Sequence, residues 1–476
     1  MLNNLKLKKM KIISKTFKLL TVFLLVIGLT SCSDDDDNGG PTDPQTNTIV
    51  DLAVATNDLS SLVAALQRAD GNLVSVLQGD GPFTVLAPTN AAFGTFLSEN
   101  GFSSLEEVPT DILSQILLNH VIAGEVTSTM LVNMGSGYTS TSATGAGGNN
   151  LSLLFDTSNG VTFNNGASVV NGLADIDADN GIVHVIDAVI GLPDVVDHAL
   201  NNSNFTSLTG ALTSEDLVTT LQSDGPFTVL APTNNAFAGF TNPNSNDLSS
   251  ILLNHVLGGV ILSTDLVSSG SGYAYTSATG PNNTDLSIYF DTSNGVVFNG
   301  LSTVSSADIV GTNGIIHVVD EVIDLPTIAT FATSNPALSS LVAALQLADT
   351  GTPTVPYITT VSDATAGPFT VFAPTNDAFA DLLLELDPSG ATALGDLDPA
   401  TVDAVLTYHI VGANVQSSGL PNGTVATLGG DITADNTAFT LTDPNGRVSN
   451  IVTSLVDIQS INGVVHVIDK VLLPQQ

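Results

Sequence analysis

The histidines are the residues of this chain most suited to metal binding or proton transfer, and six of the seven recur at equivalent places. They form two sets: His120, His255 and His409 in the first, and His184, His317 and His466 in the second. One histidine of each set could contribute to a metal site in every repeat, since imidazole is the commonest metal ligand in proteins. No third ligand recurs at a fixed offset, however, and His120 shares an apolar helix face with Ile116 and Leu117. We therefore expect hydrogen-bonded core histidines with a structural role.

Three closely spaced aspartates, Asp175, Asp177 and Asp179, have the spacing of a calcium loop. The segment lacks the glycine at the sixth position of such a loop and has Ile186 where the twelfth should be a carboxylate. The segment is therefore a predicted hairpin, with weak calcium binding as the alternative and no other cofactor expected.

A second recurrent aspartate follows each histidine of the second set by three residues, at Asp187, Asp320 and Asp469. Residues three apart on a strand point to opposite faces, so these carboxylates are not obvious partners of the imidazoles. We expect them to accept hydrogen bonds from the backbone.

Catalytic signatures are missing from the sequence. It contains no G-x-S-x-G elbow and no glycine-rich phosphate loop after a strand. Beyond residue 20 the only basic residues are Arg68, Arg447 and Lys470, which leaves little to stabilise an oxyanion. The sequence therefore predicts a protein that is not an enzyme.

The net charge excludes nucleic acid as a partner. The chain has 9 Lys and Arg against 46 Asp and Glu, for a net charge of −37. Six of the lysines lie in the first 31 residues, so removal of that segment would make the charge −43. Such a surface repels phosphate and suits a salty exterior.

The first 31 residues are typical of an export signal. A basic stretch over residues 1–18 precedes an apolar run over 19–29, which has 11 residues, whereas a membrane span needs about 20. Leu29-Thr30-Ser31-Cys32 resembles a bacterial lipobox, and Cys32 is the only cysteine. We expect residues 1–31 to be a lipoprotein signal peptide and Cys32 to carry the lipid that attaches the chain to the membrane. The alternative is an ordinary signal peptide with an incidental thiol.

The segment after the cysteine, residues 32–47, is predicted to be an acidic flexible tether. Ser33 is followed by Asp34–Asp37, and a residue other than Asp directly after the cysteine goes with outer-membrane sorting in many Gram-negative lipoproteins. The acidic run resembles the surface-export signal of some of them, or is only a solvated spacer. We expect an outer-membrane, lipid-anchored and surface-exposed protein of a Gram-negative bacterium.

Three sequence blocks recur three times in the same order. The first is GPFTVLAPTN at 81–90 and 225–234, with GPFTVFAPTN at 367–376. The second lies at 117–126, 252–261 and 406–415, and the third, which begins Asn-Gly, at 180–193, 313–326 and 462–474. These blocks resemble the fasciclin domain family over residues 49–474, which implies a β-wedge with packed helices in each domain.

The residues themselves agree with an α+β class. Leu59, Leu62 and Leu66 have helical spacing, whereas Phe-Thr-Val-Leu is a short strand that ends at Pro88. Thr89 or Asn90 supplies the N-cap of a following helix. The predicted domains are residues 48–193, 194–326 and 327–474.

The resemblance also implies a function. In some family members a Tyr-His pair in the second block is linked to receptor adhesion. Domain 3 keeps this pair as Tyr408-His409, whereas domains 1 and 2 have Asn119-His120 and Asn254-His255. The two Asn substitutions put a tyrosine-dependent contact in doubt there, and a purely structural pair is the other interpretation.

We expect a cell-surface lipoprotein that mediates adhesion or binds extracellular matrix or biofilm. Its expected partners are extracellular matrix, a cell-surface protein or a polysaccharide. One alternative is a polysaccharide-binding accessory lipoprotein, for which Tyr138, Tyr273 and Tyr275 are the only candidate stacking residues, since Trp is absent. The other alternative is a passive envelope scaffold.

Overall fold

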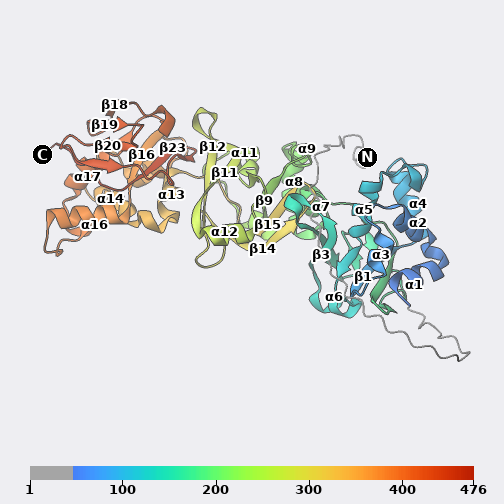
Figure 1. Ribbon diagram of the computed structural model, residues 1–476. Helices are drawn as coiled ribbons and strands as arrows, with labels where there is room; N and C mark the ends of the chain where they lie inside the picture. The colour runs from blue at the N-terminus through green and yellow to red at the C-terminus, as the bar shows by residue number, and fades with distance from the viewer. Residues whose placement is uncertain (1–46, 476) are drawn as a thin grey trace, which may run out of the picture. The chain divides into compact units, whose positions relative to one another are not determined.

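The computed structural model describes residues 47–475 (Figure 1). The predicted signal peptide, Cys32 and nearly all of the tether therefore lie outside the described residues. Contacts divide the chain into two compact units. One contains the described residues up to Ala143 together with Leu153–Gly191, and the other contains Thr144–Ser152 together with the residues from Leu192 onwards.

Domain 1 interleaves helices and strands. Its α-helices are α1 (Ile49–Ala55), α2 (Ser60–Arg68), α3 (Leu73–Leu77), α4 (Asn90–Glu99), α5 (Thr110–Leu118) and α6 (Ser128–Met134). Its strands are β1 (Phe83–Pro88), β2 (Val121–Ala123), β3 (Ser136–Thr144), β4 (Asn150–Asp156), β5 (Thr162–Phe163), β6 (Ala167–Ser168), β7 (Ile176–Ala178) and β8 (Gly181–Ile186). They form two sheets, in the orders β2-β1-β8-β7 and β3-β4-β5-β6.

Domain 2 repeats this order of elements. Its α-helices are α7 (Val195–Asn201), α8 (Thr206–Ser214), α9 (Val218–Leu221), α10 (Asn234–Gly239), α11 (Leu248–Leu253) and α12 (Ser263–Ser269). Its strands are β9 (Phe227–Pro232), β10 (Val256–Gly258), β11 (Ser271–Thr279), β12 (Asp285–Asp291), β13 (Val297–Phe298), β14 (Ser302–Val310) and β15 (Gly314–Val319). A longer β14 pairs with both β13 and β15, and β10 pairs with β11, so that the strands close into a barrel.

Domain 3 again has two sheets, β17-β16-β23-β22 and β18-β19-β20-β21. Its α-helices are α13 (Ile328–Ser334), α14 (Ser339–Asp349), α15 (Tyr357–Ser362), α16 (Asn376–Leu386) and α17 (Pro399–Thr407). Its strands are β16 (Phe369–Pro374), β17 (Ile410–Val411), β18 (Gly423–Ala426), β19 (Asp431–Asp435), β20 (Thr440–Thr442), β21 (Val448–Asn450), β22 (Ile458–Ser460) and β23 (Gly463–Ile468). The predicted α+β class is confirmed.

A parallel strand pair lies at the centre of each domain. The first and third sequence blocks form it, and in domain 1 Phe83 pairs with Gly181 and Leu86 with His184. A glycine is required at 181, because its φ is +146° and a Cβ there would lie 1.9 Å from the carbonyl oxygen of Phe83. This long-range pairing of the first strand with the last was not part of the sequence prediction, which considered only local hairpins.

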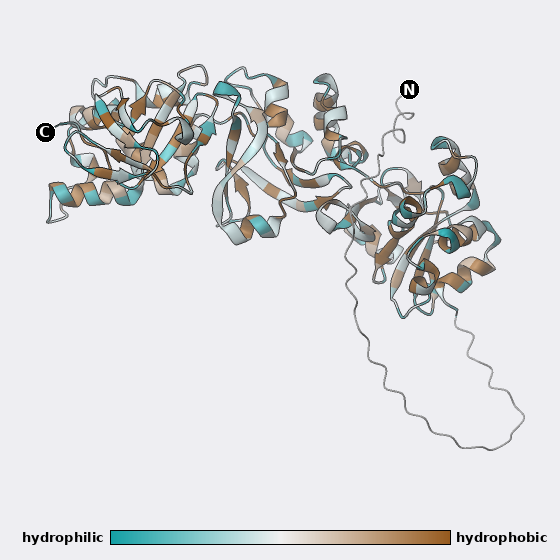
Figure 2. Cartoon of the chain, turned by 45° about the horizontal axis from the view of Figure 1, so that its top comes forward, coloured by the Kyte–Doolittle hydropathy of each residue, from teal (hydrophilic) through white to brown (hydrophobic). Residues whose placement is uncertain are grey.

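The central sheet has two buried faces. Val85 and Val183 pack against the helices, whereas Leu86 and Ile186 pack against the second sheet, beside Phe155. Because side chains alternate along a strand, His184 lies on the face of Leu86. Figure 2 shows the apolar residues concentrated along the central strands of each domain.

An asparagine fixes the first helix of each domain to this sheet. The side chain of Asn180, 6% exposed, donates to the carbonyl oxygens of Leu77 and Gly79 at 2.8 Å each, and accepts from the backbone N–H of Ile49 at 2.9 Å. The equivalent residues Asn313 and Asn462 bind the first helical N–H of their own domains in the same way. The Asn-Gly dipeptide of the third block therefore joins the beginning of a domain to its last hairpin.

The predicted N-cap is the threonine of the first block. The hydroxyl of Thr89 accepts from the N–H of Ala92 at 3.2 Å. Asn90 instead bridges two helices, because its side-chain oxygen accepts from the N–H of Ser61 at 2.8 Å.

Candidate functional site

The first histidine set lies just beyond the end of a helix, where each ring is buried. In domain 1, Nδ1 of His120 lies 2.7 Å from the carbonyl oxygen of Ile116, and the N–H of Ile190 donates to Nε2 at 2.9 Å. A backbone N–H can only donate, so Nε2 is the acceptor and the proton is on Nδ1. Both ring nitrogens are therefore occupied within the domain.

The same arrangement recurs in domains 2 and 3. His255 binds the carbonyl oxygen of Ile251 and the N–H of Ile323, at 2.8 and 2.9 Å. His409 binds Val405 and Leu472 equivalently, at 2.9 and 3.0 Å. Burial lowers the pKa of His120, His255 and His409 to about 4, so these rings are neutral at pH 7.

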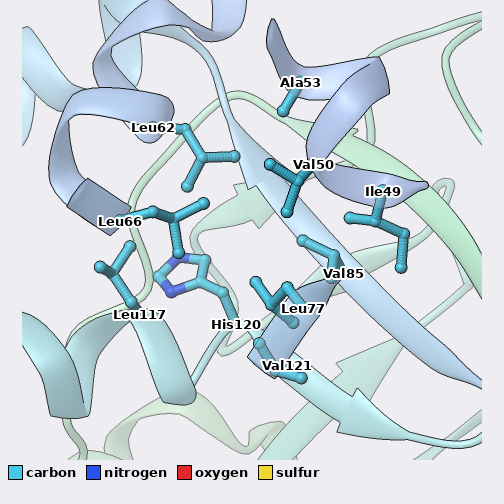
Figure 3. Close-up of a pocket in the computed structure, with 10 residues that line it drawn as sticks. All are labelled: Ile49, Val50, Ala53, Leu62, Leu66, Leu77, Val85, Leu117, His120 and Val121. Carbon is cyan, nitrogen blue, oxygen red and sulfur yellow. The ribbon is translucent and has the colours of Figure 1, made fainter. Parts of the chain in front are cut away.

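The surroundings of His120 explain this shift (Figure 3). Its ring lies among the side chains of Leu66, Leu77 and Leu117, beside a cavity of about 10 Å³. That volume is at the lower limit for one water molecule, so it offers no space for a substrate.

The asparagines that precede two of these histidines are completely buried. Asn119 donates to the carbonyl oxygen of Gly191 at 2.8 Å and accepts from the hydroxyl of Thr141 at 3.0 Å. Asn254 accepts equivalently from Thr276, at 3.1 Å. Both asparagines are 0% exposed, so neither can contact a partner in the folded chain.

Tyr408, which replaces these asparagines in domain 3, is half-buried and lies against two glycines. A Cβ at Gly429 would lie 2.5 Å from Cδ2 of the Tyr408 ring, and one at Gly430 would lie 2.6 Å from its hydroxyl oxygen. The glycines therefore make the space that the larger side chain needs.

The second histidine set has the opposite tautomer. In domain 1, the N–H of Asp175 donates to Nδ1 of His184 at 3.1 Å, and Nε2 donates to the carbonyl oxygen of Val126 at 2.9 Å. The backbone N–H of Ser128 donates to the Asp175 carboxylate at 2.7 Å, and the Ser128 hydroxyl donates to the same carboxylate. The beginning of α6, the bend before β7 and a central strand are thus held together by one polar network.

This network has the same members in all three domains: His317, Asp308 and Ser263 in domain 2, and His466, Asp457 and Ser417 in domain 3. The three aspartates have φ values of 52°, 59° and 58°, a conformation that Asp tolerates better than most residues. Burial lowers the pKa of His317 and His466. All six histidines are at most 2% exposed, and their structural role stays a prediction.

Serine, aspartate and histidine side chains meet here, but not in a catalytic order. The Ser128 hydroxyl donates to the carboxylate, and Nδ1 of His184 lies 3.8 Å from that carboxylate. Since Nδ1 accepts from the backbone and Nε2 donates to a carbonyl, no nucleophile is hydrogen-bonded to a base. The serines were not predicted from the sequence, although Ser128, Ser263 and Ser417 recur two residues after the carbonyl that binds the histidine.

The three aspartates with calcium-loop spacing are not brought together as metal ligands. Asp175 binds Ser128, whereas the Asp179 carboxylate accepts from the N–H of Asn47 at 2.6 Å. Asp177 is exposed on the edge strand β7. Among residues 47–475, no group of three or more His, Cys, Asp or Glu side chains is arranged to hold a metal ion.

The aspartates that follow the second histidine set bind the backbone, as predicted. Asp187, Asp320 and Asp469 accept from the N–H groups of Ser168, Thr303 and Asn450, at 2.7, 2.6 and 2.7 Å. Each ties the end of the last strand to a neighbouring segment.

Within residues 47–475, no single helix is long and apolar enough to cross a membrane. Two pairs of helices, Ile49–Ala55 with Asn57–Arg68 and Ile328–Ser334 with Pro336–Asp349, meet the length and composition criteria only when taken together, and they bend by 107° and 101°.

The relatives of the chain include eukaryotic and bacterial proteins. Periostin from Homo sapiens is 27% identical over 442 residues, which cover 90% of this chain and 47% of periostin, so the chain spans about half of that relative. Protein sll1483 from Synechocystis is 40% identical over 143 residues, or 30% of this chain and 72% of that protein. Cell surface glycolipoprotein MPB83 from Mycobacterium bovis is 33% identical over 147 residues, or 31% of this chain and 60% of MPB83.

Among solved structures, a FAS1 domain pair from the insect cell adhesion molecule fasciclin I is 21% identical. It covers 56% of this chain and 97% of its own, with a TM-score of 0.35. The model of the fasciclin domain family matches residues 57–193, 203–326 and 336–474. The three repeats, with their shared blocks and polar networks, are therefore fasciclin domains, and the chain belongs to the fasciclin domain family.

Proposed function

We propose that the chain is a cell-surface lipoprotein that mediates adhesion, or binds extracellular matrix or biofilm, through its outer surface. Family membership supports this proposal, as does the name of one relative, a cell surface glycolipoprotein. The buried polar residues that recur in the repeats form hydrogen bonds inside their own domains. Recognition must therefore use side chains that the domains do not share.

The observation that carries the proposal is the exposed apolar surface of α6 in domain 1. Met130, Val132 and Met134 on this helix are 52%, 57% and 57% exposed. In domain 2, the equivalent helix α12 has Asp265 and Ser269 where domain 1 has the two methionines. Methionine is flexible and polarizable, and it is common at protein-binding surfaces. A chain this poor in basic residues needs such apolar contacts to hold a partner.

Domain 2 provides the substitutions that test the role of α6. The double variant Met130→Asp, Met134→Ser gives α6 the residues of α12. We expect beads coated with this variant to bind matrix proteins or biofilm polysaccharide at least tenfold less than beads coated with the original chain. Val267→Ser on α12 is the matched control and should bind as before. Equal binding by the double variant would contradict a contact through α6.

Buffer composition separates direct contact from bridging by calcium. Because the carboxylates of Asp175 and Asp179 already accept hydrogen bonds, we expect bead binding to survive a chelator. Binding that needs millimolar calcium, and that sodium chloride at matched ionic strength cannot replace, would instead favour carboxylate bridging to an acidic partner.

Polysaccharide capture is the second candidate function, and one tyrosine favours it. Tyr275 is 55% exposed, as a sugar-stacking ring must be. Tyr273 does not share this role, because its ring packs against Tyr289 and Phe331. A glycan array that gives signals lost in Tyr275→Ala would support this candidate over protein adhesion.

The lipid anchor rests on the sequence alone. We expect Cys32→Ala to leave an unprocessed or released protein, because the variant lacks the sulfur that would receive the lipid. Partition of this variant into the detergent phase together with fatty-acid labelling would show that the anchor is elsewhere.

A further inference from the structure

The first helices of the three domains differ at one inward position. The fourth residue is Leu52 in α1, His198 in α7 and Phe331 in α13. An asparagine fixes each helix to the central sheet in the same way, so the three side chains occupy equivalent places. Because these three side chains differ in size, they fill the space between the helix and the sheet to different extents.

In domain 3 this place is filled by an aromatic side chain of the domain itself, which a second aromatic ring covers. Phe331 is 0% exposed, and the ring of Tyr273 from β11 of domain 2 packs edge-on against it, with centroids 5.5 Å apart and planes at 81°. The side chain of Asn335 donates to the Tyr273 hydroxyl at 3.2 Å. The ring of Phe331 thus closes the space beneath this helix, and a tyrosine from the neighbouring domain packs on it.

In domain 1 the equivalent place is hollow. Leu52 is shorter than Phe331, and a cavity of about 130 Å³ lies between α1 and the sheet, with Val85, Val183 and Ile176 in its wall. Apolar cavities of about 150 Å³ bind a single benzene ring. The cavity therefore has the volume and lining that an aromatic ring requires.

The rim of the cavity is accessible and has polar groups. Leu173 at the rim is 40% exposed, and Thr56 and Asp58 are exposed. Thr56 stands where domain 3 has Asn335, so both domains have a polar side chain at this point. The Asp58 carboxylate offers an acceptor for a phenol hydroxyl and would repel an anionic ligand.

We propose that the cavity beneath α1 of domain 1 binds the aromatic side chain of a partner polypeptide, in particular tyrosine. In domain 3 the ring of Phe331 fills the equivalent place and Tyr273 of the neighbouring domain packs on it, which supports a polypeptide source over a free small molecule. This inference goes beyond the proposed function, because ring binding is a property of domain 1 whether or not the chain adheres to a surface.

The test is a titration of the whole chain with 4-methylphenol and with N-acetyl-tyrosinamide, followed by NMR. For one ring we expect a dissociation constant on the order of 1 mM for both compounds. Methyl signals of Leu52, Val85 and Val183 should shift. N-acetyl-leucinamide should bind at least tenfold more weakly.

Two variants locate the site. Leu52→Phe gives α1 the residue of α13 and fills the cavity, so binding should fall at least tenfold. Val54→Phe adds the same ring to the same helix at a position that is 63% exposed, and it should bind like the original chain. If Leu52→Phe does not fold, the methyl shifts of the original chain still decide whether the cavity is occupied.

Five outcomes would overturn the proposal. No binding at 10 times the expected dissociation constant, or shifts only at methyl groups away from the cavity, would remove the site. Unchanged binding by a folded Leu52→Phe variant would do the same. Binding of 4-methylphenol without N-acetyl-tyrosinamide would show a small-molecule pocket, and equal binding of the leucine compound would show no aromatic selectivity.

Discussion

Domains 1 and 3 hold the first histidine in the same way but differ at the residue before it. His120 and His409 each bind one backbone carbonyl and one backbone N–H, with distances that agree within 0.2 Å. The preceding side chain is a buried amide, Asn119, in domain 1 and a half-buried phenol, Tyr408, in domain 3. The histidine is therefore the fixed structural element, whereas its neighbour is matched to the local packing.

Exchange of these neighbours should give the largest effect. Asn119→Tyr forces a ring into a space that is fully buried and already contains Thr141, so we expect a loss of about 3 kcal/mol in the free energy of unfolding of domain 1. Tyr408→Asn should cost domain 3 about 2 kcal/mol, because a half-buried ring is lost. Chemical denaturation measures both, and equal effects would show that the two sites are packed alike.

Acid should weaken all three domains through the first histidine set. The pKa of His120, His255 and His409 is about 4 in the folded chain, against about 6.5 when unfolded. Below pH 6.5 the unfolded chain binds protons that the folded chain does not. Stability is therefore complete above pH 6.5 and declines toward pH 4, by at most about 3 kcal/mol per histidine.

Denaturation at pH 7, 6, 5 and 4 measures this decline. Neutralisation of carboxylates reduces charge repulsion and opposes the decline. The variant His120→Gln provides the control, because its domain 1 should lose less stability on acidification than the original. NMR signals of a protonated His120 ring at pH 6 in the folded chain would contradict the expectation.

Loss of a histidine from the second set should have a smaller effect. We expect His184→Ala to cost about 1–3 kcal/mol, since it leaves the N–H of Asp175 and the carbonyl of Val126 unpaired. His317→Ala should cost domain 2 a similar amount, because its network has the same members. A loss of stability in only one of the two domains would show that the two networks are not equivalent. Stoichiometric zinc that disappears with these mutations would instead favour a metal site.

Removal of the serine hydroxyl should give the smallest effect. We expect Ser128→Ala to cost about 1 kcal/mol, because Asp175 keeps its bond to the Ser128 backbone N–H. Thr129→Ala, the next residue on α6, is the control and should change stability by less than about 0.5 kcal/mol. An effect of Ser128→Ala as large as that of His184→Ala would show that the hydroxyl controls the whole network.

The sequence predicted those features that depend on local pattern. Apolar neighbours were sufficient to identify His120 and His184 as core residues, and strand alternation separated Asp187 from the imidazole. Features that depend on pairs of distant segments were not predictable in this way. The bond between Asn180 and Ile49 spans 131 residues, and the serine of the second network is 47 residues from its aspartate.

Spacing was misleading where backbone conformation decides the geometry. Asp175, Asp177 and Asp179 alternate like ligands of a calcium loop, but the left-handed conformation of Asp175 turns its carboxylate toward Ser128. The cavity of domain 1 was equally hidden, because a leucine at position 52 is an ordinary core residue. The cavity is recognised only when Leu52 is compared with Phe331, which contacts Tyr273 of another domain.

The asparagine that joins the first helix to the last hairpin has a mechanical consequence. Each domain begins at a helix whose first N–H is held by Asn180 or its equivalent. The last strand of the domain begins at the residue directly after this asparagine. A pulling force on the two ends of domain 1 therefore enters beside Gly181 and leaves beyond Ile186, along the axis of β8. The covalent backbone of β8 carries this tension, so the hydrogen bonds that pair β8 in parallel with β1 along its whole length are not loaded. Tension passes through one strand of each domain, and the rest of the domain carries no load until the asparagine releases the helix.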